Sequence, residues 1–213
     1  MDGTVSAATG APQLPAWSYS APEFLFVGND LWLDFVNTEV VADGTRVDLL
    51  GSEANLREWL IKAGIPGGWD APHSIDSDLL SRALEFRALL RRMADGMSRG
   101  LPAPEEAIRA VNRLLRSRSG SEQLFRHGDR WRKEFRADDA GEAAPLLPIA
   151  HSAADLIAEG DPRLVRKCEG PTCILYFYDT SKNHKRRWCS MAGCGNRHKA
   201  AVHRKRIRDV EAA

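Results

Sequence analysis

The residues best suited to chemistry in this 213-residue chain are its four cysteines, which form two matching pairs near the C-terminus. Cys168 and Cys173 enclose four residues, as do Cys189 and Cys194, and fifteen residues separate the two pairs. Thiolates on two facing loops are typical ligands of a tetrahedral metal ion, for which zinc is the natural occupant. We therefore expect one zinc ion, held by four sulfurs, to replace the hydrophobic core that so short a segment lacks.

Two alternatives to this four-sulfur site stay open at this point. The cysteines could pair as disulfides in an oxidising compartment, although the first ten residues lack the basic start and apolar run of a signal peptide. A histidine could replace one ligand, and three lie close enough in sequence: His184, His198 and His203. Each loop also contains a glycine, Gly170 or Gly193, which lets the backbone turn tightly and direct amides at the sulfurs.

The charge of the chain is divided between its two ends. The whole sequence has a net charge of +1, but residues 164–213 contain 12 Lys and Arg against 4 Asp and Glu. The preceding residues contain 18 basic and 25 acidic side chains. A few cations suffice to offset the negative charge of a zinc–thiolate centre, so most of this excess is typical of a nucleic-acid-binding module attached to a non-binding domain.

The segment after Cys194 is expected to form a basic helix, because it contains no proline and no glycine beyond residue 195. At about 100° per residue, one stripe of this helix contains Arg197, Ala201, Arg204 and Arg208. A separate apolar face, expected to pack on a neighbouring hairpin, collects Ala200, His203, Ile207 and Val210. Such a helix could lie against a DNA groove, with basic side chains reaching phosphates or base edges. The expected nucleic-acid contacts are Arg186, Arg187, Arg197, Lys199, Arg204, Lys205 and Arg208.

Between the cysteine pairs, residues 174–178 are predicted to form a strand and residues 185–189 a return strand, across a turn-forming segment. Loop, hairpin, loop and helix in that order describe a treble-clef arrangement. The aromatic side chains of this hairpin are interpreted as the small core of the finger, with base stacking as the alternative. They are Tyr176, Phe177, Tyr178 and Trp188.

Two stretches of the chain resemble a known bacterial family. The cysteine-rich segment, which includes Cys194-Gly195-Asn196-Arg197, is similar to the CGNR zinc finger. The segment 33–38, LDFVNT, is similar to the opening of the ABATE domain, which precedes that finger in the family. The resemblance implies that all four cysteines are zinc ligands. It also implies a stress-induced transcription regulator whose finger binds DNA and whose N-terminal domain holds a small-molecule or regulatory pocket.

The longer N-terminal part is predicted to be an α+β domain, because strands and helices are mixed without strict alternation. The predicted elements are a hairpin of 23–27 and 31–36, helices over 53–63, 76–98, 104–115 and 143–158, and a second hairpin of 123–126 and 130–135. The predicted organisation is a flexible tail over 1–21, an ABATE-like domain over 22–160 and a zinc finger over 164–210.

Three polar residues at the end of the apolar run 31–36 are candidates for a ligand pocket: Asp34, Asn37 and Thr38. Their alternative role is to hydrogen-bond neighbouring loop backbone. No apolar run approaches the length of a membrane span, so no membrane partner is expected.

These patterns favour a cytoplasmic bacterial DNA-binding regulator, with a small-molecule effector and a homodimer as further partners. A zinc-stabilised protein-interaction module, or RNA in place of DNA, is the alternative. We expect no enzyme, because four cysteine ligands leave zinc no open position for water.

Overall fold

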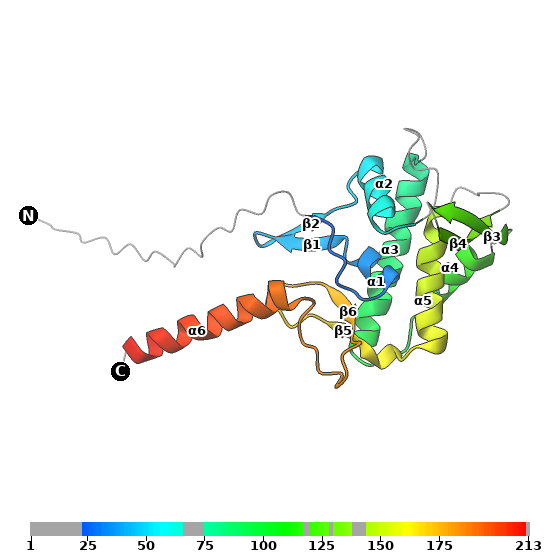
Figure 1. The fold of residues 1–213 in the computed structure, drawn as a ribbon. Coiled ribbons are helices and arrows are strands. Elements are labelled where there is room, and N and C mark those ends of the chain that lie inside the picture. The colour runs from blue at the N-terminus through cyan, green and yellow to red at the C-terminus, as the bar shows by residue number, and fades with distance from the viewer. Residues whose placement is uncertain (1–22, 66–74, 117–119, 128–129, 138–143, 212–213) are drawn as a thin grey trace, which may run out of the picture.

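A computed structural model describes residues 23–65, 75–116, 120–127, 130–137 and 144–211. The predicted tail over 1–21 lies outside these described residues. Five helices form the body of the molecule (Figure 1): α1 (Leu31–Val36), α2 (Glu53–Lys62), α3 (Ser77–Ser98), α4 (Glu105–Arg116) and α5 (Leu147–Glu159). Small two-stranded sheets join them, which confirms the α+β class. None of the described helices is both long and apolar enough to cross a membrane.

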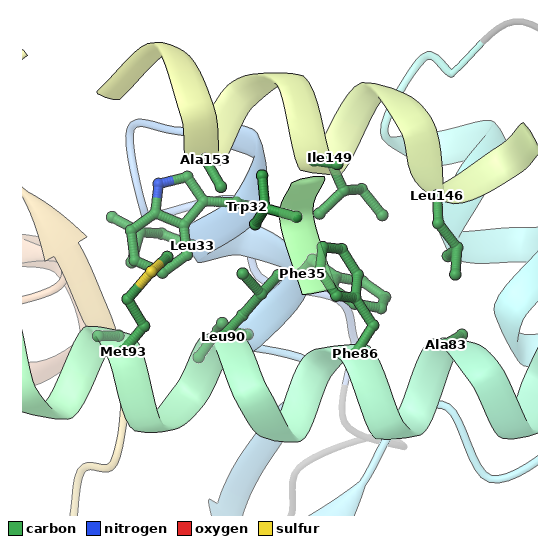
Figure 2. Packing of buried hydrophobic residues seen from close by; sticks show 14 of the residues in the cluster. Trp32, Leu33, Phe35, Ala83, Phe86, Leu90, Met93, Leu146, Ile149 and Ala153 are labelled. Atoms are coloured by element: carbon green, nitrogen blue, oxygen red, sulfur yellow. The ribbon is translucent and has the colours of Figure 1, made fainter. Parts of the chain in front are cut away.

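The short helix α1 lies at the centre of the body, between α3 and α5. Figure 2 shows the side chains of Trp32, Leu33 and Phe35 packed between two helices. Phe86 and its neighbours on α3 lie on one side, and Ile149 and its neighbours on α5 lie on the other. All three of these α1 side chains are completely buried. Burial of apolar surface here is the main stabilising term for the body, since each such side chain contributes about 1.5–3 kcal/mol.

The predicted hairpin of 23–27 and 31–36 was wrong, because 23–27 forms no strand and α1 is helical over 31–36. A short apolar run bounded by polar residues has no periodicity that separates a buried strand from a buried helix. The tertiary structure makes the difference, since neighbours on several sides bury the faces of this helix that carry Trp32, Leu33, Phe35 and Val36.

The longer predicted helices are confirmed within a few residues at each end. Ser52 caps α2 by accepting a hydrogen bond from the amide of Asn55 at 3.2 Å. Asp76 caps α3 in the same way through the amide of Leu79 at 2.8 Å. Gly64 follows α2 with a φ of 69°, a left-handed conformation that glycine adopts readily and that ends the helix.

Two hairpins belong to the N-terminal part. Strand β1 (Glu39–Ala42) pairs with β2 (Thr45–Asp48) across Asp43 and Gly44, which both have positive φ as a tight hairpin turn requires. The sequence reading did not predict this pair. Strand β3 (Gly120–His127) pairs with β4 (Arg130–Ala137), which confirms the second predicted hairpin and extends it by several residues.

The finger begins with a short antiparallel pair, β5 (Val165–Lys167) with β6 (Tyr176–Tyr178). The predicted return strand over 185–189 is absent, and this segment is a loop that accepts one backbone hydrogen bond, from the amide of Glu169 to the carbonyl of Arg187 at 2.9 Å. A five-residue π-helical turn, Met191–Gly195, leads into α6 (Asn196–Glu211).

Helix α6 projects away from the rest of the molecule (Figure 1), and none of its residues is buried. The predicted packing of its apolar face on a hairpin was therefore wrong. Ile207 is 45% exposed and Val210 is 78% exposed. Helical propensity and the π-helical turn at its start explain why the helix forms, but beyond its first turn nothing in the described chain covers it.

Candidate metal centre and basic helix

The four cysteines converge from different parts of the finger. Cys168 follows β5, and Cys173 lies in the turn before β6. The amide of Cys173 donates to the carbonyl of Gly170 at 2.9 Å, which closes this turn. Cys189 ends the long loop, and Cys194 lies in the π-helical turn. Ser190 caps that turn through the amide of Gly193 at 3.3 Å, which fixes the turn beside the loop.

The geometry of the four sulfur atoms suits one tetrahedral zinc ion. All four lie within 4.8 Å of one another, with 3.8 Å between the sulfurs of Cys173 and Cys189 and 3.6 Å between those of Cys189 and Cys194. A tetrahedron with zinc–sulfur distances of about 2.3 Å has edges of about 3.8 Å. The cysteines are free thiols rather than disulfides. The predicted zinc site is confirmed.

The three histidines considered as substitute ligands do not belong to the group of residues that could hold the metal ion. His184 contacts the backbone carbonyl of Asp179 through Nδ1 at 3.0 Å. His198 packs its ring on Trp188 with 4.8 Å between the centroids. His203 is an exposed residue of α6. The donor set is therefore four thiolates.

The electrostatics of the cluster also favour a bound cation. Hydrogen bonds from neighbouring thiols lower the pKa of Cys168, whereas proximity to the other sulfurs raises the pKa of Cys173 and of Cys189. The four groups cannot all ionise in so small a volume unless positive charge is added. Zinc supplies that charge when bound, and then all four sulfurs serve as thiolates.

Groups around the sulfurs hold them in place. The amide of Cys189 donates to the sulfur of Cys168 at 3.3 Å, and Arg197 donates to the sulfur of Cys194 through Nη2 at 2.9 Å. Such outer contacts orient metal ligands and spread their negative charge. Gly170 lies so close that a Cβ atom there would be 2.9 Å from Cβ of Cys173 and 3.1 Å from the sulfur of Cys194.

The aromatic residues predicted to form the core of the finger divide between two clusters: Phe177 and Trp188 pack beside the cysteines, whereas Tyr176 and Tyr178 pack in the core of the body. Tyr176 and Phe177 are buried, and Phe177 packs with the cysteines and with Val40 and Leu49 of the N-terminal part. The Tyr178 hydroxyl accepts the amide hydrogen of residue 161 at 3.1 Å. The metal centre therefore shares one apolar cluster with residues more than a hundred positions earlier in the chain.

A buried amide joins the body to the finger. Asn37 donates to the carbonyl of Tyr176 through Nδ2 at 2.8 Å and accepts from its amide at Oδ1 at 2.9 Å. Two arginines of α3 lie beside this junction, and one of them, Arg91, contacts the finger directly. Arg91 donates to the carbonyls of Val36 and Ile174, each at 3.1 Å. These contacts fix the finger against α1 and α3.

The second arginine, Arg87, is almost completely buried and binds both carboxylate oxygens of Asp48 at 2.6 Å. Burial by itself raises the pKa of Asp48, but the hydrogen bonds and charge of Arg87 outweigh it and lower the pKa. Arg87 also donates to the Thr38 hydroxyl at 3.0 Å. Sequence reading missed both arginines, because a charged residue on an amphipathic helix normally faces solvent.

The candidate ligand-pocket residues all bind protein groups. Asn37 and Thr38 are buried in the contacts just described. Asp34 accepts the amide hydrogen of Gly28 at 2.7 Å, and burial raises the pKa of its carboxyl group to about 6. The loop held by Asp34 in turn accepts the amide of Tyr178 at the carbonyl of Gly28, at 2.7 Å. The alternative role, binding loop backbone, is the one that the geometry supports.

Three of the expected nucleic-acid contacts are engaged within the finger. Arg186 donates to the carbonyls of Val27, Trp188 and Cys189, and its guanidinium lies over the ring of Phe177. Arg187 forms an ion pair with Glu169 at 2.6 Å. As described above, Arg197 donates to a zinc ligand. These side chains brace the metal centre.

The other expected contacts form an exposed basic surface on α6. Lys199, Arg204, Lys205 and Arg208 are exposed and make no ion pair or hydrogen bond with the part of the chain that the structure describes. Arg206, which the sequence reading omitted, shares these properties. Its position on the side opposite the arginine stripe explains the omission.

Two known families match the chain in adjacent segments. Residues 29–160 match the ABATE family, described as "Putative stress-induced transcription regulator". Residues 164–207 match the CGNR zinc finger. A comparison with curated proteins finds no match.

Proposed function

The chain belongs to the ABATE family of transcription regulators and carries a CGNR zinc finger, and from this premise we propose that it binds duplex DNA through α6. The observation that carries the proposal is a set of exposed cations on a helix that, beyond its first turn, nothing else in the described chain covers. An isolated helix of this length is marginally stable in water, so a partner that covers it adds stability.

The placement of the cations around α6 suits a groove with two phosphate walls. At about 100° per residue, Arg204 and Arg208 lie on one flank of the helix. Lys199 and Arg206 lie on the opposite flank, about half a turn away. The DNA major groove is about 12 Å wide and admits an α-helix, whose two flanks then face the two phosphate backbones. A helix of 16 residues is about 24 Å long, so the cations span several base pairs.

The basic surface continues from α6 into the finger. A hollow of about 460 Å³ is lined by Lys185, Arg187 and Trp188 together with serine and asparagine side chains. Trp188 connects this hollow to α6, because its ring packs on His198. Cations and hydroxyl groups in one hollow are typical donors to phosphate oxygens.

Zinc has a structural role in this proposal. When bound, it links the loop and the π-helical turn from which α6 starts, so it sets the direction of the helix. Four thiolates complete its tetrahedral coordination and leave no position for a reacting water, so we assign no catalytic activity. The proposal places the protein in the bacterial cytoplasm, with the cell's DNA.

The test is a fluorescence-anisotropy titration of the zinc-loaded protein with random duplex DNA at several salt concentrations. If five cations contact phosphates, affinity should fall about 500-fold between about 50 and 200 mM salt. Replacing Arg204 and Arg208 by glutamate should abolish binding at physiological salt. Replacing Arg113 and Arg116 of α4 by glutamate changes net charge equally and should leave binding nearly unchanged.

A flat salt dependence, or equal losses in the two charge-reversal variants, would refute duplex binding by α6. A second candidate function, as a protein-interaction module, is supported by the exposed apolar side chains of Ile207 and Val210. Under that function, Ile207→Ser abolishes partner binding while the arginine variants retain it. RNA is distinguished in the same titration by a duplex RNA of equal length, which lacks a major groove open to a helix.

A further inference from the structure

The β3–β4 hairpin forms a second basic surface, at the opposite end of the molecule from α6 (Figure 1). Among the described elements, each of its strands packs chiefly on the other. A two-stranded ribbon alone is only marginally stable in water, and a partner that covers it adds stability.

One face of this hairpin exposes two large apolar side chains between two cations. The strand register pairs Leu124 with Lys133 and Arg126 with Trp131, so all four side chains lie on the same face. Leu124 is 64% exposed and Trp131 is 65% exposed. Tryptophan is normally well covered by protein, so a ring exposed to this degree and flanked by cations is a candidate binding surface.

The opposite face of the ribbon is also basic. Arg130 and Arg132 lie there, are exposed, and make no ion pair or hydrogen bond within the described part of the chain. The described residues at this end of the hairpin, 124–126 and 130–133, include four cations and no acidic residue.

We propose that this hairpin binds single-stranded nucleic acid, with Trp131 stacked on an unpaired base and the surrounding cations contacting phosphates. Aromatic rings placed among cations are the usual components of such sites, because every base presents a π-face and every nucleotide a negative charge. A second copy of the chain is disfavoured, since two such faces would bring like charges together. An intact duplex is disfavoured too, because its stacked bases leave no face for an indole ring.

This inference does not rest on duplex binding by α6, and the two can be tested separately. Fluorescein-labelled oligodeoxythymidine and oligouridine are titrated with zinc-loaded protein, alongside Trp131→Ala, Trp131→Phe and the double variant Arg130→Glu with Arg132→Glu. Trp131→Ala should weaken single-strand binding about tenfold and Trp131→Phe much less. The double variant reverses the charges of the opposite face, so it should weaken binding less than Trp131→Ala does, whereas Arg204→Glu with Arg208→Glu should leave binding intact.

Equal affinity of Trp131→Ala and the unaltered protein for both oligonucleotides would overturn the proposal. So would a loss of single-strand binding in the α6 variant alone, since that assigns the contact to α6. Because Trp131 is exposed, its replacement should leave the unfolding temperature unchanged, which circular dichroism checks. Binding of an acidic protein ligand in preference to either oligonucleotide would also count against a nucleic-acid partner.

Discussion

Replacing Gly170 by alanine should weaken zinc binding without disturbing the rest of the fold. The added Cβ would lie 2.9 Å from Cβ of Cys173 and 3.1 Å from the sulfur of Cys194, whereas unstrained contacts begin at 3.4 Å. Cys173 must therefore move by about 0.5 Å and Cys194 by about 0.3 Å, and displacements of this size are enough to spoil a preorganised site. Disturbing groups around a metal typically costs 10–100-fold in affinity, and we expect a loss in that range, or about 1.4–2.7 kcal/mol.

The measurement is competition for zinc between the protein and a colorimetric chelator, with metal content checked by mass spectrometry. Gly193→Ala is the matched control, because it adds the same methyl group to the other cysteine loop. The nearest atoms to a Cβ at Gly193 belong to Ser190 at 3.9 Å, so this control should bind zinc nearly as tightly as the unaltered protein. Equal affinities of the two variants would refute the steric reasoning.

Three further predictions concern the junction of the finger with the body. Asn37→Asp should destabilise the protein by about 2–4 kcal/mol at neutral pH, because one carboxylate oxygen would face the carbonyl of Tyr176. Denaturant unfolding measures this loss, and Asn112→Ala, at an exposed position, should change the free energy of unfolding little. Removing zinc with a chelator should raise the rate of amide hydrogen exchange in β1 as well as in the finger, because Val40 of β1 shares an apolar cluster with the cysteines. An increase confined to the finger would contradict this. Burial raises the pKa of Asp34 to about 6, so the folded state favours its protonated form and its contribution to stability is lost as pH rises from about 4 to 6. Asp34→Asn should therefore stabilise the protein by about 1–2 kcal/mol at pH 7, after allowance for solvent screening, and the gain should vanish near pH 4 in unfolding curves.

The metal site was predictable because its chemistry is local and depends on residue type. Four thiols in two short loops can converge on zinc over a wide range of surrounding structures. The cap residues Ser52 and Asp76 likewise bind amides only three residues from their own position, which makes helix starts of this kind readable from sequence. Short-range hydrogen bonds of this kind can be predicted from sequence, because the donor and the acceptor are a fixed number of residues apart.

The roles of the polar residues were harder to predict, because their partners lie far away in the chain. Asn37 binds Tyr176 across 139 residues, and Arg186 reaches Val27 across 159. Nothing in the spacing of these residues shows whether an arginine will meet phosphate or a buried carbonyl. The contacts of Arg186 with backbone carbonyls are therefore a consequence of the tertiary structure alone.

By itself, the sequence determined that this protein binds one zinc ion through four thiolates, carries a basic C-terminal helix and belongs to the α+β class. Only the tertiary structure decided that α1 is a buried helix, that the finger shares its core with the N-terminal part, and that α6 is left uncovered. The physical reason is that ligand chemistry and helix propensity act over a few residues, whereas burial depends on which distant surfaces meet.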